Sequence, residues 1–164
     1  ILRKLVGAWI RKGAGTMAYQ KLMLGLQLDI PDTVHPATEI CKANLPGGQS
    51  QYAVLALGRF GRREHLPTLE KMLTDKTVLS TSRVNNQPSW TSELRDVALA
   101  AMLHITQQDP KEYGFIKLQK HPQYLFAPNT AGFVKAADRE KALSMWAAWR
   151  ETDLKTTPAA AEKP

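Results

Sequence analysis

The sequence predicts an all-α protein, built as a short α-solenoid in which antiparallel helix hairpins stack in a row. Apolar residues recur at helical spacing along most of the chain, and one predicted helix is apolar almost all round. Two segments also match without gaps at an offset of 31 residues, which pairs Pro36 with Pro67. Helix pairs of this length cannot bury their apolar faces alone, so stacked neighbours must cover them.

The composition fits one folded domain. A chain of 164 residues can bury a core, and its charged and apolar fractions, 23% and 43%, are ordinary for a globular protein. We therefore assign residues 1–154 to one domain, with a long loop at 76–91, and residues 155–164 to a flexible tail. The net charge of +7 favours acidic partners, although it can also serve solubility alone.

Membrane and disulfide signals are weak. No apolar run approaches the roughly 18 residues that a membrane-spanning helix needs, and no signal peptide opens the chain. The first residue is Ile1 rather than methionine, so we expect a processed form or a piece of a longer protein. The single cysteine, Cys41, rules out an internal disulfide framework and a cysteine-rich zinc site. None of these features indicates a compartment.

Three helices are predicted before the centre of the chain. The first spans residues 2–12, with apolar side chains three and four apart. The second spans residues 16–28 and opens on Thr16, whose hydroxyl can cap its first turn. The third spans about residues 32–44 and is followed by a loop at 45–48, which is rich in proline and glycine.

The stretch Ser50–Asp75 is the centre of the predicted architecture. Its first helix is apolar almost all round at residues 54–57, so two sides of it must be covered. This helix ends at Gly61, which suits a left-handed C-terminal cap. A charged turn follows, and Pro67 fits the first turn of a second helix, where its missing N–H costs little. We expect these two helices to form one antiparallel hairpin.

The polar segment Lys76–Thr91 interrupts the helical rhythm. It is longer than most connections between helices, and long loops are more often functional than short ones. Its apolar residues can instead anchor it onto the body: Val78, Leu79, Val84 and Trp90. Ser92 is predicted to cap the next helix, whose apolar positions run from Leu94 to Ile105 at helical spacing.

The remainder of the chain is less regular. We expect a short helix near residues 115–120, irregular structure over 122–132, and a last helix capped by Asp138. Trp146 and Trp149 lie on the apolar face of that last helix, and Trp146 is expected to cover the open end of the row.

The repeated segments resemble HEAT repeats, particularly the short bacterial HEAT-like type. The matching residues are AVLALGRFG at 53–61, followed by the helix that contains Pro67, and LRDVALAAM at 94–102. The resemblance covers roughly residues 16–108, and the segment beyond it is similar to the closing part of HEAT-like modules in large bacterial proteins. The family implies a scaffold for protein–protein contact, without chemistry of its own.

The sequence shows no convincing catalytic or metal-binding constellation. His35 and His65 occupy nearly equivalent turns, so stacking can bring them within about 10 Å, but no further ligand cluster joins them. Cys41 lies on a predicted buried face and behaves as a small apolar residue. The P-loop, nucleophile-elbow and zinc-protease patterns are missing from the sequence. We therefore expect no enzymatic activity, no cofactor and no metal.

Polar residues within the repeats are expected to be structural. Arg95 and Asp96 open the second matching helix, and such residues usually join neighbouring helices through hydrogen bonds.

The predicted function is that of a non-catalytic protein–protein interaction scaffold, a subunit or domain of a larger complex. A basic cluster at the central turn can instead neutralise phosphates, so a nucleic-acid-binding solenoid is the alternative. Acidic residues interrupt that cluster, which favours a protein partner. A third, more distant possibility is an accessory domain of a longer enzyme. The predicted interface consists of basic and large aromatic side chains: Arg59, Arg62, Arg63, Arg83, Trp90 and Trp149.

Overall fold

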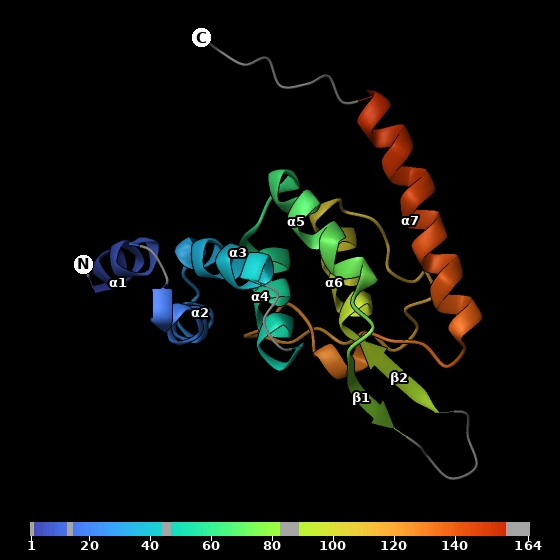
Figure 1. The fold of residues 1–164 in the computed structure, drawn as a ribbon, viewed down its shortest axis with the longest axis horizontal. Coiled ribbons are helices and arrows are strands. Elements are labelled where there is room, and N and C mark those ends of the chain that lie inside the picture. The colour runs from blue at the N-terminus through green and yellow to red at the C-terminus, as the bar shows by residue number, and fades with distance from the viewer. Residues whose placement is uncertain (1, 13–14, 44–46, 83–88, 157–164) are drawn as a thin grey trace.

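The protein is mainly α-helical, with a small two-stranded sheet near the middle of the sequence (Figure 1). The computed structural model describes residues 2–12, 15–43, 47–82 and 89–156. The described residues up to Phe60 form four α-helices, separated in part by the short 3-10 turns η1 (Gly15–Met17) and η2 (Pro31–Thr33). The helices are α1 (Leu2–Arg11), α2 (Ala18–Gln27), α3 (Val34–Ala43) and α4 (Gly47–Phe60).

The part of the chain after α4 combines short and long elements. After α4 the chain forms the 3-10 turn η3, the one-turn helix α5 and the 3-10 turn η4, and then a β-hairpin. Two longer helices follow, separated by irregular chain that contains the turn η5. The bounds are η3 (Arg63–His65), α5 (Leu66–Glu70), η4 (Lys71–Thr74), β1 (Val78–Ser82), β2 (Trp90–Glu93), α6 (Leu94–Ile105), η5 (Pro128–Thr130) and α7 (Ala136–Thr156).

The helices alternate between two layers in chain order. In one layer α2 packs against α4 and α4 against α6, while in the other α1 contacts α3 and α3 contacts α5. Consecutive helices join the layers through the pairs α1–α2, α3–α4 and α5–α6. The elements from α1 to α7 therefore follow one another along the longest axis of the molecule (Figure 1).

The closest helix contacts differ from the predicted hairpin of the central stretch. The predicted hairpin joined α4 to the helix at Pro67, which is α5, but α4 makes its broadest contacts with α3 and α6. α5 is short and packs against α6 and α3. The apolar character of α4 has the expected consequence, because Ala53 to Leu57 are five consecutive residues with no exposed surface.

The buried positions also repeat at a different spacing. Ala37 and Leu69 are buried and lie 32 residues apart, as do Ile40 and Met72. The ungapped offset of 31 pairs Cys41 with Met72, which are both buried, but it also pairs buried Ile40 with exposed Lys71. The matching prolines lie in the first turns of α3 and α5, and no single offset aligns every buried position that follows them.

Helix α6 is the most deeply buried element. Leu94 to Leu103 form ten consecutive buried residues, rather than the single stripe that the sequence pattern indicated. α4, α5 and η4, β2 and α7 all contact α6. Such complete coverage explains why its sequence is alanine-rich, since small side chains let several neighbours approach one helix.

The starts of two helices differ from the predicted ones. Thr16 lies in η1, and α2 begins at Ala18 without a side-chain hydrogen bond at its cap. Ser92 belongs to β2, and its hydroxyl donates to the carbonyl of Pro128 at 2.8 Å.

Further boundaries shift in the loops. α4 begins at Gly47, so the predicted 45–48 loop ends earlier, and its residues 45–46 lie outside the described residues. The segment 115–120 is not helical, and α7 begins at Ala136, before the predicted cap Asp138. Lys155 and Thr156 extend α7, while the rest of the predicted tail is outside the described residues.

The described residues of the predicted 76–91 loop include β1 and the start of β2. β1 and β2 pair antiparallel, with Ser80 opposite Ser92 and Ser82 opposite Trp90. An isolated bridge between Thr91 and Phe133 attaches β2 to the chain that precedes α7. The hairpin is inserted between η4 and α6, so the two halves of one helix pair are separated by a small sheet (Figure 1).

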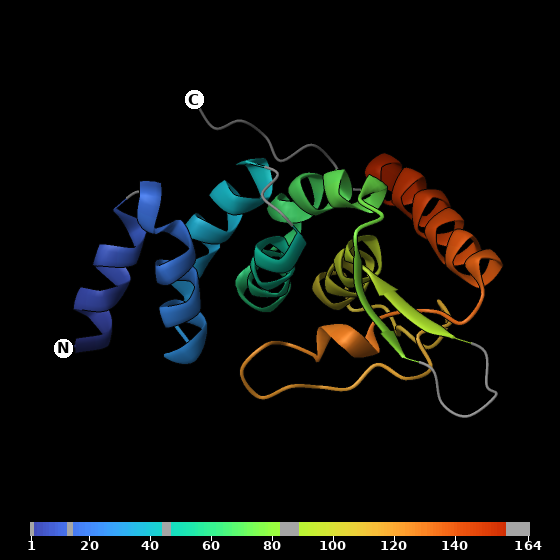
Figure 2. The same ribbon diagram turned by 60° about the horizontal axis from the view of Figure 1, so that its bottom comes forward.

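The irregular segment from Thr106 to Lys135 runs along one side of α4 and α6 (Figure 2). Tyr124 in this segment packs edge-on against Tyr52 of α4, with ring centres 5.2 Å apart. Leu125 contacts α4 at Gly58, where an added Cβ would lie 2.7 Å from the leucine Cδ2. Within the described ranges, no helix combines the length and the apolarity needed to cross a membrane.

Candidate interaction surfaces

A polar hollow of about 700 Å³ lies on the layer that contains α1, α3 and α5. We call it the ridge groove. It lies between the start of α3 and the turn that leads into α5. Its walls include Asp32, His35, Thr38 and Glu39 on one side, and Arg62 and His65 on the other. The groove therefore joins the corresponding turns of two successive helix pairs.

The two histidines of equivalent turns line this one groove, as their positions in the sequence suggested. His65 Nδ1 accepts a hydrogen bond from the Arg62 backbone N–H at 3.1 Å, which leaves Nε2 as its available nitrogen. In the part of the chain that the structure describes, no group of three or more His, Cys, Asp and Glu side chains is placed to hold a metal ion.

The ridge groove contains both signs of charge. Arg11 reaches across to Asp32, with Nη2 2.7 Å from Oδ1, so this pair is neutralised within the protein. Arg62 and Lys42 supply positive charge, and Glu39 and Glu64 supply negative charge. A mixed polar lining of this kind suits the polar surface of another protein better than a uniformly anionic ligand.

Arg59, one of the predicted interface residues, is engaged inside the protein. Its Nη1 donates to the carbonyl oxygens of Pro122, at 2.9 Å, and Gln123. Its Nη2 lies 2.9 Å from Asp29 Oδ1. These contacts join α4 to the irregular segment and to the end of α2, so Arg59 holds remote parts of the chain together.

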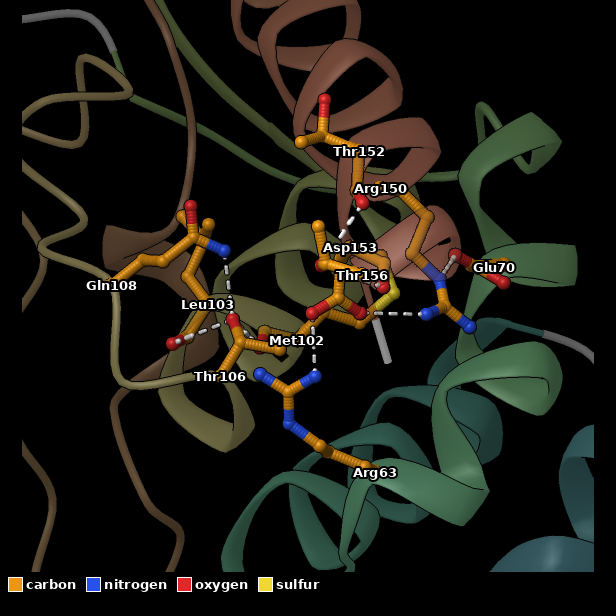
Figure 3. Close-up of polar contacts among 10 residues, drawn as sticks. All are labelled: Arg63, Glu70, Met102, Leu103, Thr106, Gln108, Arg150, Thr152, Asp153 and Thr156. Atoms are coloured by element: carbon orange, nitrogen blue, oxygen red, sulfur yellow. Dashed lines mark hydrogen bonds and ion pairs between the residues drawn. The ribbon is translucent and has the colours of Figure 1, made fainter. Parts of the chain in front are cut away.

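Arg63 and Trp149 lie together at the seam between η3 and α7. Figure 3 shows Arg63 reaching the carboxylate of Asp153 on α7. The Arg63 guanidinium carbon is 5.8 Å from the Trp149 ring centre, and Nη1 is 2.6 Å from Asp153 Oδ1. Asp153 Oδ2 in turn accepts from Arg150, whose Nε is 2.8 Å from Glu70 Oε1. This chain of charges attaches the C-terminal half of α7 to η3 and α5.

The two arginines hold the Asp153 carboxyl in its ionised form. The hydrogen bond from Arg63, reinforced by Arg150, lowers the pKa of Asp153 below its ordinary value. The α7 seam is thus an electrostatic contact whose strength depends on the charge of one carboxylate.

The predicted anchor Trp90 lies inside the protein. It is 4% exposed, and its indole N–H donates to the Asn129 carbonyl at 3.0 Å. Lys117 covers the ring, with Nζ 4.9 Å from the ring centre. Trp90 therefore fixes β2 onto the irregular segment, while Arg83 lies outside the described residues.

The polar residues that open α6 form a buried charged cluster with α7. Arg139 contacts both Asp96 and Glu93, and Arg95 contacts Glu93 and, at 2.9 Å, Glu140. Burial raises the pKa of the Asp96 carboxyl, and hydrogen bonds from Arg139 oppose that rise. Arg95 and Asp96 thus join helices through hydrogen bonds, and their partner helix is α7.

A second hollow of about 700 Å³, more apolar than the first, lies beside the C-terminal end of α6. We call it the α6-end groove. Phe115 and Phe126 contribute to its floor, and Lys111 and Lys120 also line it. The sequence does not predict this groove, because most of its walls come from a segment that has no helical or strand periodicity.

Comparisons with protein-family models, with curated proteins and with solved structures found no match for this chain. The function is therefore inferred from the fold and from the two grooves.

Proposed function

We propose that the protein is a non-catalytic interaction scaffold, a subunit or domain of a larger complex, built as a short HEAT-like α-solenoid. The observation that carries this proposal is the alternation of helices between two layers in chain order. In such arrays the turns form a continuous ridge, which suits extended protein contacts.

The ridge groove is the proposed binding surface. It joins equivalent turns of successive helix pairs, and Arg62 and His35 lie in its walls. A preformed groove on stacked helices loses little conformational entropy when a partner docks. Its mixture of acidic and basic side chains supports a partner of complementary polarity rather than a polyanion.

Nucleic-acid binding is supported less well. Eight arginines lie in the described residues, and seven of them pair with Asp or Glu of this chain. Arg62 is the exception among these eight, since no ion pair to a described carboxylate involves it. Arginines engaged in this way contribute little to the release of counterions from phosphates.

The proposal can be tested with charge-reversal variants. Cross-linking in the source cells, followed by mass spectrometry, identifies neighbouring proteins, and the purified pair is then titrated. We expect Arg62→Glu to weaken the complex by about tenfold, because charged groups at an interface contribute on this scale. Lys135→Glu, an exposed site before α7, is the matched control and leaves the affinity unchanged.

Two results would contradict the scaffold proposal. One is a complex whose affinity neither variant changes. The other is tight binding to duplex or single-stranded nucleic acid that falls steeply between low and moderate salt, which would support the alternative function.

A further inference from the structure

The α6-end groove has a buried apolar floor, and Ile116, Leu118 and Leu125 add apolar lining that solvent reaches. Ala100 and Phe115 are each 1% exposed, and Phe126 is 3% exposed. Phe115 is supported from behind by Phe133, with ring centres 4.8 Å apart. At the mouth of the groove Ile116 is 74% exposed. A volume of about 700 Å³ lies within the range of small-molecule sites.

Backbone hydrogen bonds fix one wall of this groove. Ala127 N–H donates to the Gln119 carbonyl at 2.9 Å, and His121 N–H donates to the Leu125 carbonyl at 3.2 Å. Lys120 and Phe126 pair as an isolated antiparallel bridge between these two bonds. The bridge places Lys120 directly beside an aromatic residue of the floor.

The opposite wall is fixed in a similar way. Phe115 N–H donates to the Pro110 carbonyl at 3.1 Å, and Gly114 N–H donates to the Lys111 carbonyl at 3.0 Å. Asp109 Oδ1 accepts the Lys111 backbone N–H at 2.9 Å. Since both walls are held by the protein itself, a ligand would meet a largely preformed site.

The charges on the lining favour an anion. Lys111 and Lys120 are cationic, whereas Asp109 is the acidic residue among the described lining residues and already accepts a backbone hydrogen bond. His104 lies at the same end of the groove, and burial together with the nearby Lys120 lowers its pKa. A neutral imidazole adds one donor and one acceptor next to the lysine.

We propose that the α6-end groove binds an amphiphilic carboxylic acid, with its apolar chain against Ile116, Leu118 and Leu125 and its carboxylate at Lys120. Lysine provides a single point charge, and the described lining contains no arginine fork of the kind that grips phosphates. A ligand with one negative charge and an apolar chain matches both features. The ridge groove and the proposed scaffold role have no part in this inference.

The test compares ligands that share a chain and differ in their head group. Decanoate, decanol and decyltrimethylammonium are titrated into the full chain by calorimetry, below the concentrations at which they form micelles. We expect saturable one-to-one binding of decanoate that is about tenfold tighter than that of either comparison ligand, as expected for a charge-assisted contact.

Two variants distinguish the groove from the rest of the surface. Lys120→Glu is expected to weaken decanoate binding by about tenfold, because it replaces an attraction by a repulsion. Lys117→Glu makes the same change of net charge three residues away, over the Trp90 ring and outside the groove, and leaves the binding unchanged. Ile116→Asp, at an exposed position, should weaken binding of every ligand that uses the apolar lining.

Several outcomes would overturn the assignment. Decanoate binding that does not saturate would show that the groove does not recognise the carboxylate. Equal affinities of Lys120→Glu and Lys117→Glu for decanoate would show the same. Backbone chemical-shift changes that map away from residues 100–126 would place binding elsewhere. Preferential binding of decyltrimethylammonium would assign the site to a cation instead.

Discussion

Arg139 and Asp96 form a buried two-point ion pair that joins α7 to α6. Arg139 Nε is 2.8 Å from Asp96 Oδ1, and Nη2 is 3.0 Å from Oδ2. The Asp96 side chain is 1% exposed and the Arg139 side chain 6% exposed. Asp96 Oδ2 also accepts the Glu93 backbone N–H, and Arg139 Nη2 donates to the Thr91 carbonyl. One charge pair therefore connects α7, α6 and β2.

Removing Arg139 should be strongly destabilising. In Arg139→Met the Asp96 carboxylate stays buried beside Glu93 without its main cation, so we expect a loss of about 3–5 kcal/mol in the free energy of unfolding. Asp96→Asn should lower the free energy of unfolding by less, because Arg139 still pairs with Glu93, with Nη1 3.1 Å from Oε1. Urea denaturation measures both changes. Lys155→Met, which breaks an exposed pair with Glu151, serves as a control and should change stability by about 0.5 kcal/mol or less.

The α7 seam should weaken in acid. The pKa of Asp153 is depressed in the folded protein, so its stabilising contribution is present above the unfolded pKa of about 3.9 and is lost as pH falls through the folded value. We expect Asp153→Asn to be less stable than the wild type at neutral pH, and the difference to shrink below about pH 4. Denaturant unfolding of both proteins across this pH range checks the prediction.

A matched variant on the same helix isolates the effect of the seam. Glu151→Gln alters an exposed carboxylate that pairs only with Lys155 among the described residues. Its stability difference should be small at every pH. If Asp153→Asn and Glu151→Gln showed the same pH profile, the network with Arg63 and Arg150 would not hold α7 in place.

The sequence predicted the elements whose burial follows from local pattern. The apolar run of α4 required cover on two sides, and α3 and α6 supply it. The β-hairpin was missed although a signal was available. Val78, Thr81 and Thr91 flank the turn formers Asn85 and Asn86, and β-branched residues on both sides of such a pair are typical of a hairpin.

The contacts of the predicted interface residues were harder to predict, because they join distant parts of the chain. Arg63 and Asp153 are 90 residues apart, and no local rule pairs one arginine with one carboxylate. The sequence allowed Trp90 either to anchor an interface or to pack the 76–91 loop onto the body, and its contacts with the Asn129 carbonyl and Lys117 show the packed arrangement. Periodicity indicates which face of an element is buried, but it does not indicate which partner covers it.

Close helix packing makes Gly25 sensitive to substitution. A Cβ on this residue of α2 would lie 1.9 Å from Thr33 Oγ1, and Thr33 is fully buried. We expect Gly25→Ala to lower the free energy of unfolding by about 1–3 kcal/mol, as overpacked substitutions do. That loss should appear even though alanine favours a helix by about 1 kcal/mol over glycine. Thermal and urea unfolding provide the measurement.

Gly48 supplies the control for this substitution. It lies in α4, and an added Cβ would have no neighbour within 4 Å. Gly48→Ala should therefore keep or raise stability, since only helix propensity changes. Equal effects of the two substitutions would show that the contact between α2 and η2 is looser than the structure indicates.

The thiol of Cys41 should be chemically inert in the folded protein. Cys41 is 3% exposed on the core side of α3, and burial raises its pKa to about 12. An ordinary cysteine has a pKa of about 8.5, so at pH 8 the folded protein should contain at least about a thousandfold less thiolate. Labelling with a chromogenic disulfide reagent should be correspondingly slow, and denaturant should restore the normal rate.

An exposed cysteine in the same chain sets the reference rate for this measurement. The double variant Cys41→Ala/Ser144→Cys places a thiol on the solvent side of α7, where labelling should be fast without denaturant. Because only the thiolate reacts, the ratio of the two rates reports the combined effect of burial and pKa at Cys41. Native labelling of Cys41 at a rate near that of the exposed thiol would mean that α3 opens readily from α4, and that the core between them is not continuously packed.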